Sequence, residues 1–521
     1  MTKGRKKSDG RVVPEGMRKD PPTEGTPGGK ATTGSEQVEQ MGLFSGTADS
    51  SREAGAKAET GQPGSARSAV PKPEKKNKYA PPAMTMEEVA RETNLLEALG
   101  RVKKNHGAPG PDRQSVDAVY AHRQKLLPEL QKALQNGTYE PGMVRRAWIP
   151  KADGGQRGLG IPNVIDRWVQ QAVYQVMNPH YDPTFHASSH GFRPGRSCQT
   201  AIAEAVRYLD EGNEWVVDID LEKFFDRVNH DRLMSRLAER IDDARLLKLI
   251  RRMLKATVVM PDGVVVMNEE GTPQGGPLSP LLSNIVLDEL DRELEQRGHR
   301  FVRYADDCNI YVRSERSGQR VMESIGRFIE GRMRLKINRQ KSAVAKPEDR
   351  HFLGFRLRRE PLDGSIEVLL SKRTLTRIDE TIRQKTPRNW GQSLRSCIRG
   401  LNSYLQGWMG FFSICTSSEE RTFHTLDAHI RRRLRAIILK QCKGKRTIAK
   451  RLIALGARMK TVWKTLASGK RSLWALSHTS VVHKALSNAY FVNHGLVSLE
   501  RLWTAKHRQV VVSTQQSFVW G

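Results

Sequence analysis

The sequence predicts an α+β protein in which a region of mixed strands and helices is followed by a region of helices alone. Up to about Leu370, short β-branched runs alternate with amphipathic segments, a pattern typical of a sheet flanked by helices. Beyond Leu370 the apolar residues recur at helical spacing. Residues 1–78 are rich in Gly, Pro, Ser, Thr, Lys and Glu. They predict a disordered tail, because such a segment buries too little apolar surface to offset the entropy lost on ordering.

Order is predicted to begin near Met86. Val89, Leu95 and Val102 belong to an apolar stripe that predicts a helix over 87–104. The other predicted elements are mainly helical structure over 112–134, a β-hairpin over 144–161, helices over 164–176, 198–209 and 281–296, and, beyond Leu370, helices over 374–383, 392–412 and 419–440.

Charge is the strongest compositional signal. The 521 residues include 87 Lys and Arg against 57 Asp and Glu, which gives a net charge of +30 and a pI near 10.1. Small domains typically carry a net charge of only ~2–8. The excess therefore predicts a polyanionic partner, and nucleic acid is the expected one.

Cysteine spacing and hydropathy indicate the cellular compartment expected for the protein. The five cysteines are spread singly without a C-x-x-C pair, which indicates neither a zinc site nor a disulfide framework and suits a reducing interior. No apolar run approaches the ~20 residues that a membrane span needs, and no apolar segment follows the charged N-terminus. We therefore expect a cytoplasmic protein without a membrane partner.

An acidic pair carries the clearest chemical signal. Tyr304-Ala305-Asp306-Asp307 lies between two short alternating apolar runs. Two strands meeting at a tight turn would place both carboxylates at a hairpin tip, where their repulsion is tolerated beside cations. Such a pair suits two Mg²⁺ ions that activate an attacking hydroxyl and stabilise a leaving pyrophosphate. A solvated acidic turn is the alternative interpretation.

Two upstream segments accompany this pair. In 216–226 a β-branched run leads into an acidic stretch, and an Asp at the end of that strand is a candidate third carboxylate. In 271–282 a Gly- and Pro-rich loop containing Gln274 runs into an amphipathic helix. Its glycines permit close approach of a bulky partner, and Gln274 can hydrogen-bond in the loop.

Taken in this order, the segments resemble the palm of a reverse transcriptase, and further motifs narrow the resemblance to the group II intron reverse transcriptase/maturase family. It extends from about Leu95 to the C-terminus, and the supporting motifs lie at 106–112, 148–151, 154–162, 189–197, 335–342, 352–355, 401–408 and 432–435.

The resemblance implies a right-hand polymerase with fingers and palm over 79–370 and a helical thumb/maturase (X) domain over 371–475. Residues 476–521 would be a short C-terminal segment, either a DNA-binding remnant or a packing cap. The sequence shows no counterpart of the Cys/His-rich endonuclease found in many members, so we expect an endonuclease-less member.

The family chemistry implies a primer 3′-hydroxyl attacking the α-phosphate of a dNTP, with Asp220, Asp306 and Asp307 holding two Mg²⁺ ions. The backbone carbonyl of Ile219 is a further expected ligand. Asp220 is preferred to Asp218 because the family pattern places an aromatic residue five positions after the first metal ligand. That residue is Phe225, which is predicted to exclude a ribose 2′-hydroxyl.

The resemblance assigns other roles. Lys151 and Arg157 would clamp the triphosphate, Gln274 would support the nucleotide or template, and Lys341 would protonate the departing pyrophosphate. Arg193 and Arg196 would line the template path, although a structural role for their turn is the alternative. Nucleic-acid binding is also predicted for a basic helical face, with a solvated surface as the alternative; its residues are Arg431, Arg432, Arg435, Lys443, Lys445 and Arg446.

The function expected from the resemblance is a reverse transcriptase that copies RNA into DNA and assists splicing and mobility of its own group II intron RNA by binding it. The implied partners are the intron RNA, an RNA template with a DNA primer or target, and dNTPs. Two alternatives remain: a polymerase-inactive RNA-binding splicing factor, and a free-standing bacterial reverse transcriptase of another class.

Overall fold

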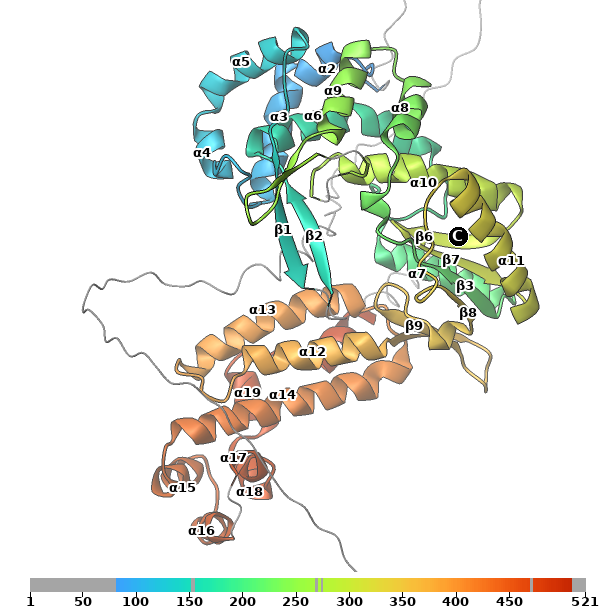
Figure 1. Ribbon diagram of the computed structural model, residues 1–521. Helices are drawn as coiled ribbons and strands as arrows, with labels where there is room; N and C mark the ends of the chain where they lie inside the picture. The colour runs from blue at the N-terminus through green and yellow to red at the C-terminus, as the bar shows by residue number, and fades with distance from the viewer. Residues whose placement is uncertain (1–80, 151–154, 268–269, 273–274, 469–471, 508–521) are drawn as a thin grey trace, which may run out of the picture. The chain divides into compact units, whose positions relative to one another are not determined.

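The computed structural model describes residues 81–150, 155–267, 270–272, 275–468 and 472–507. The predicted disordered tail, Lys151 and Gln274 lie outside these ranges. The described chain follows the predicted order, with mixed strands and helices up to Leu370 and helices beyond it (Figure 1). The predicted α+β class is confirmed. None of the described helices has the length and apolar character needed to cross a bilayer.

The first described helices surround a buried tryptophan. Trp168 has no exposed surface, and its indole Nε1 donates a 2.6 Å hydrogen bond to the Leu95 carbonyl. The helix predicted over 87–104 is divided at Arg91, whose ψ of 131° ends one helix before the next begins. The five helices of this group are α2 (Met86–Ala90), α3 (Glu92–Lys104), α4 (Val116–Ala121), α5 (Arg123–Gln135) and α6 (Val164–Tyr181).

The predicted β-hairpin is confirmed as β1 (Val144–Pro150) and β2 (Gln156–Ile161), which pair antiparallel with Ile149 opposite Arg157. Two short strands, β4 (Val258–Val259) and β5 (Val265–Val266), complete a sheet of order β2-β1-β4-β5. The exposed side chain of Arg157 is thus carried on a strand rather than on a loop.

A second sheet, here called the central sheet, has the order β6-β7-β3-β8 and is antiparallel throughout. Its strands are β3 (Trp215–Ile219), β6 (Arg300–Tyr304), β7 (Asp307–Val312) and β8 (Ala343–Ala345). Helix α11 (Glu315–Arg327) contacts β3, β7 and β8, and α7 (Cys198–Asp210) contacts β6 and β7. The strand side chains alternate accordingly, with Val217 and Ile219 in one hydrophobic cluster and Val216 in another.

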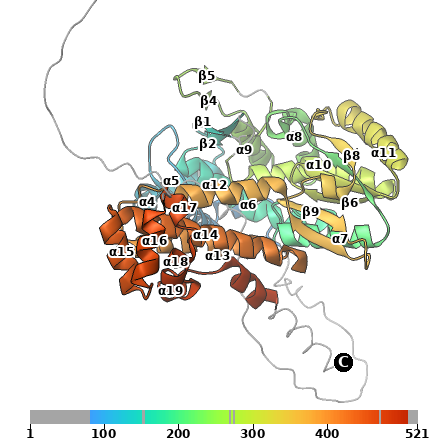
Figure 2. The ribbon, with the colours of Figure 1, turned by 90° about the horizontal axis from the view of Figure 1, so that it is seen from below.

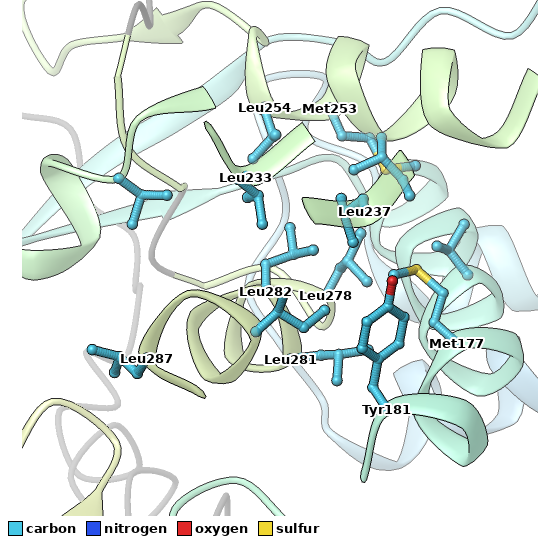
Figure 3. Packing of buried hydrophobic residues seen from close by; sticks show 14 of the residues in the cluster. Met177, Tyr181, Leu233, Leu237, Met253, Leu254, Leu278, Leu281, Leu282 and Leu287 are labelled. Carbon is cyan, nitrogen blue, oxygen red and sulfur yellow. The ribbon is translucent and has the colours of Figure 1, made fainter. Parts of the chain in front are cut away.

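The first cluster joins the central sheet to the preceding helices. Helix α10 (Ser279–Gln296) supplies Leu278, Leu281 and Leu282 at and near its start. These pack among side chains of α6, α8 (His230–Ala238) and α9 (Ala244–Leu254), as Figure 3 shows for Met177, Tyr181, Leu233, Leu237, Met253 and Leu254. This packing fixes α10 beside the strands that carry the acidic residues.

The second cluster extends from α7 and one face of the central sheet into the helical region. A two-stranded sheet of β9 (Phe355–Arg359) and β10 (Ile366–Leu370) precedes α12 (Lys372–Lys385), α13 (Leu394–Phe412) and α14 (Glu420–Gln441), and these three helices lie side by side (Figure 1). Trp408 packs on Phe412 at a ring-centroid distance of 4.6 Å. Beyond α14 the helices gather into a small group (Figure 2): α15 (Lys445–Ala454), α16 (Met459–Ala467), α17 (Leu473–Leu476), α18 (Ser480–Ala485) and α19 (Asn488–Asn493).

The described part of the C-terminal segment packs into this second cluster. The Trp503 indole donates a 2.9 Å hydrogen bond to the Cys415 carbonyl. The buried carboxylate of Asp427 accepts hydrogen bonds from the Ser498 hydroxyl and from the backbone N–H groups of Leu499 and Glu500. For residues 476–507 these contacts favour the packing role over a separate DNA-binding module.

Candidate active site

The acidic pair sits on a tight hairpin turn, as the sequence predicts. Tyr304 pairs with Asp307, so that Ala305 and Asp306 alone connect β6 to β7. Ala305 has a φ of 58°, a left-handed conformation that costs a non-glycine residue roughly 1–2 kcal/mol. Neighbouring backbone holds it there: a Cβ atom on Gly191 would lie 2.2 Å from the Ala305 nitrogen.

Asp220 reaches the same turn from β3. Ile219 pairs with Cys308, so one further step of the antiparallel register places Asp220 opposite Asp307. The end of β3 is anchored from the other side, because the Asp220 N–H donates to the Ser342 hydroxyl at 3.0 Å and its carbonyl accepts from the Asn338 N–H at 2.9 Å. The strand register therefore places Asp220 beside the acidic turn that carries Asp306 and Asp307.

Electrostatics show that the three acids are close enough to repel one another. Desolvation, followed by repulsion from Asp306, Asp218 and Asp220, raises the pKa of Asp307 to about 7. The pKa of Asp306 is also raised, chiefly by desolvation, while the charge of Arg157 acts to lower it. The Asp307 side chain is exposed, so solvent can reach a carboxylate that protein otherwise surrounds. A bound cation would therefore strongly stabilise the ionised form of the Asp307 carboxylate.

Asp218 has its own counter-ion. Arg350 approaches one Asp218 oxygen with two nitrogens, at 2.6 and 2.9 Å. Within the described ranges, Asp220 forms no ion pair. This difference supports Asp220 as the residue left available for a metal ion.

The donor set fits Mg²⁺. Among the described residues, no group of three His, Cys, Asp or Glu side chains is arranged as a ready-made metal site. Mg²⁺ in phosphoryl-transfer sites typically takes one or two carboxylates and completes its octahedron with water and substrate phosphates. Adjacent carboxylates that repel one another match that requirement, and the remaining ligands would arrive with the nucleotide.

Phe225 lies near the end of β3, in a short 3-10 turn, η2 (Phe224–Asp226). Its ring is half-buried and meets Phe224 edge-on at 5.3 Å. The Phe225 carbonyl accepts a 2.6 Å hydrogen bond from the Thr272 N–H, and a Cβ on Gly271 would lie 2.6 Å from that oxygen. The glycine loop is therefore fixed against Phe225 just before it reaches Gln274.

Two of the other predicted nucleotide contacts, Arg157 and Lys341, lie within the described residues. The charge of Arg157 opposes the rise in the pKa of both Asp306 and Asp307, so this arginine lies within electrostatic range of the acidic turn. Lys341 is exposed and immediately precedes Ser342, which contacts Asp220. The roles assigned to Arg157 and Lys341 stay predictions.

Among the predicted nucleic-acid contacts, two arginines are committed to the protein itself. Arg193 donates to the Asp182 carboxylate at 2.8 Å and to three backbone carbonyls, which favours the structural alternative for its turn. Arg435 lies buried rather than on a basic surface, because its Nε donates to the Leu486 carbonyl at 2.9 Å. Arg432 stacks on Trp474 at 4.0 Å.

The remaining predicted contacts stay accessible. Arg196 and Arg431 are half-buried, and Lys443, Lys445 and Arg446 are exposed.

One residue important for the acidic turn was not predicted from the sequence. Arg303 is fully buried on β6, and all five of its N–H donors are used. Two reach the Asp291 carboxylate at 2.7 and 2.5 Å, and the others reach Asn284 Oδ1 at 3.0 Å, the Ala305 carbonyl at 2.9 Å and Ser189 Oγ at 2.6 Å. Arg303 thus ties the acidic turn to α10. A charged residue at a core-facing strand position was the available signal.

A second polar network lies behind the turn. The His190 N–H donates to the Arg303 carbonyl at 2.8 Å, and the His190 ring bonds Glu204 at 2.6 Å. Desolvation acts to raise the pKa of Glu204, but hydrogen bonds from His190, Tyr208 and Ser188 lower it to about 2. The segment that covers β6 is therefore held by charged hydrogen bonds as well as by backbone pairing.

Comparison with known proteins gives the same picture. Residues 149–357 match the family of reverse transcriptases (RNA-dependent DNA polymerases), and residues 375–453 match the group II intron maturase-specific domain. Protein YkfC of Escherichia coli (strain K12) is 33% identical over 346 residues, covering 58% of this chain and 88% of YkfC. Group II intron-encoded protein LtrA of Lactococcus lactis subsp. cremoris is 28% identical over 334 residues, covering 49% of this chain and 55% of LtrA.

Fold, acidic turn and matched regions define a reverse transcriptase, an RNA-directed DNA polymerase domain followed by a helical maturase region. The chain belongs to the group II intron reverse transcriptase/maturase family. It spans most of YkfC and about half of LtrA.

Proposed function

We propose that this protein copies RNA into DNA by two-metal nucleotidyl transfer and assists splicing and mobility of a group II intron RNA by binding it. One observation supports the polymerase activity above all: Asp220 directly follows β3 and lies one register step beyond the Ile219–Cys308 pair, opposite Asp307 at the start of β7. A solvated acidic turn would not require a third carboxylate, delivered from a neighbouring strand.

Each residue has a defined task in this proposal. Asp220, Asp306 and Asp307 would hold the Mg²⁺ ions, which when bound lower the pKa of the primer 3′-hydroxyl and neutralise the triphosphate. Arg157 would grip phosphate oxygens through its planar fork. Phe225 would lie against the sugar, where a 2′-hydroxyl would collide with its ring. Lys341 would supply a proton to the departing pyrophosphate.

Assistance to splicing would come from a different part of the chain. The region matching the maturase-specific domain includes exposed cations such as Lys443 and Lys445. Such cations would contact backbone phosphates and so recognise the shape of the folded RNA. These contacts weaken as the salt concentration rises, because binding releases counter-ions. The intron RNA itself would perform the transesterification. The proposed location is the bacterial cytoplasm.

Primer extension on an RNA template with Mg²⁺ tests the polymerase assignment. Asp306→Asn with Asp307→Asn should abolish DNA synthesis while RNA binding and splicing assistance persist, because the substitution removes metal ligands and keeps the shape of the turn. Asp117→Asn, at an exposed position in the first turn of α4, is the matched control.

Two outcomes would contradict the proposal. A wild-type protein that binds RNA but incorporates no dNTP would favour the splicing factor without polymerase activity. Equal loss of synthesis, RNA binding and splicing assistance in the double variant would refute the separation of the two activities.

A further inference from the structure

A recess in the helical region contains none of the residues assigned so far. This open recess has a volume of about 360 Å³ and lies where α13 meets the turn that follows α19. Its polar lining consists mainly of Arg395, Arg399, Asn402 and Gln406 from α13, with His494 and Gly495 from the C-terminal segment. Residues three and four apart on a helix share a face, so the α13 residues form one polar stripe.

The two arginines are not explained by the fold. Both are exposed, and neither has a hydrogen-bond or ion-pair partner among the described residues. Arg395 lies in the first turn of α13, where the positive end of the helix dipole disfavours a cation. The chain also contains no acidic residue between Glu380 and Glu419, or between Asp427 and Glu500. Uncompensated positive charge at this place favours an anionic ligand.

The recess is held in a fixed form by contacts between its two sides. Asn402 donates to the Gly495 carbonyl at 2.6 Å and accepts from the Val497 N–H at 3.1 Å. His494 is oriented by a 2.7 Å hydrogen bond from Nδ1 to the Tyr490 carbonyl and by stacking on the Tyr490 ring at 4.2 Å. That bond leaves Nε2 as the ring nitrogen available to a ligand.

We propose that this recess binds a phosphodiester group of RNA, with Arg395 and Arg399 as the principal contacts and His494 as a third. Two guanidinium forks one helical turn apart can each form paired hydrogen bonds with phosphate oxygens. The inference rests on the proposed RNA-binding function and adds a location to it. It also gives the C-terminal segment a part in the RNA surface, beyond packing against α13.

The test is a charge-removing pair of substitutions, Arg395→Gln with Arg399→Gln, in the full chain. The matched control is Arg101→Gln with Arg297→Gln, which removes the same charge from two arginines that are paired with glutamates on their own helices. Binding of a fluorescein-labelled RNA hairpin is followed by anisotropy across about 50–200 mM NaCl. Loss of a phosphate contact should lower the salt slope by about 1 and weaken binding about tenfold.

The control pair should stay within about twofold of wild type in the same assay. A recess variant that matches the control in slope and affinity would overturn the inference. Primer extension by wild type is measured in parallel, so that loss of the recess alone leaves the polymerase proposal standing. Arg395→Lys with Arg399→Lys keeps the positive charge but removes the paired hydrogen bonds of the guanidinium groups. Its affinity for the RNA hairpin should lie between those of wild type and the Gln pair.

Two nucleic acids can supply the phosphodiester, and the same variants separate them. If the recess holds intron RNA away from the acidic turn, the Gln pair binds the hairpin about tenfold more weakly but extends a pre-bound template–primer at the wild-type rate. If it holds the template–primer itself, extension also falls at limiting template and recovers at saturating template. Either result, together with the lowered salt slope, supports the site.

Discussion

Replacing Arg303 should separate the stability of the core from the geometry of the acidic turn. Arg303 and Asp291 are both fully buried. Arg303→Leu would therefore leave a buried carboxylate without its cation, at a cost of about 3–5 kcal/mol in the free energy of unfolding. A typical protein has only about 5–15 kcal/mol in total, so the variant should melt at a clearly lower temperature and lose DNA synthesis.

The informative variant is the double one, Arg303→Leu with Asp291→Leu. Removing both charges should recover most of the lost stability, because a buried ion pair is often matched by well-packed apolar residues. DNA synthesis should not recover, since the Ala305 carbonyl still lacks the donor that holds the turn. Thermal unfolding and single-turnover primer extension measure the two effects. If synthesis returns together with stability, Arg303 acts through the core alone and the positioning role is refuted.

Three further predictions concern the same site. Because desolvation and neighbouring acids raise the pKa of Asp307 to about 7, protons should compete with Mg²⁺, so the Mg²⁺ requirement for synthesis should fall as pH rises from about 6 to 8. The stability of the protein without Mg²⁺ should change in the opposite direction with pH. Because the pKa of Asp307 is raised in the folded state, this group stabilises the fold below about pH 4, and the contribution is lost as pH rises through 7. Gly191→Ala should displace the turn and reduce synthesis at least about tenfold, whereas Gly100→Ala, which meets open space, should not. Asp220→Asn should abolish synthesis, while Asp218→Asn should retain it within about tenfold.

Each of these predictions has a contrary result. A Mg²⁺ requirement that is constant across that pH range would mean that Asp307 is not a ligand. Normal synthesis by the Gly191 variant would show that the close approach to Ala305 does not matter. Loss of synthesis in the Asp218 variant and survival in the Asp220 variant would reverse the choice between the two acids.

The acidic turn was predictable because its determinants are local in the sequence. Two short alternating runs flank it, and β3 needs only one step of register to deliver Asp220. Arg303 was not predictable in the same way, since it contacts Ser189, which lies 114 residues away in the sequence, as well as Asn284 of α10. Its environment depends on how α10 packs, and periodicity does not fix that.

Helical periodicity also misplaced Arg435. An amphipathic pattern indicates one buried face, but the C-terminal segment covers part of the opposite side of α14, where the Leu486 carbonyl meets the Arg435 guanidinium. The single helix expected over 87–104 divides at Arg91 for a related reason. The Asn94 side chain bonds the Val89 carbonyl at 3.0 Å and the Ala172 carbonyl of α6 at 3.2 Å, so a tertiary contact stabilises the break.

The shared second cluster limits how this enzyme can be dissected. Val302, Tyr304 and Ala305 at the acidic turn belong to the same apolar core as Leu401 and Trp408 of α13. Phe355 on β9 contacts Phe412 in a tilted arrangement, with ring centroids 5.2 Å apart. A fragment ending at Leu370 would leave that aromatic surface bare to water. The polymerase region is therefore not a separable module. The helices that would bind RNA also supply part of the apolar core on which the acidic turn packs.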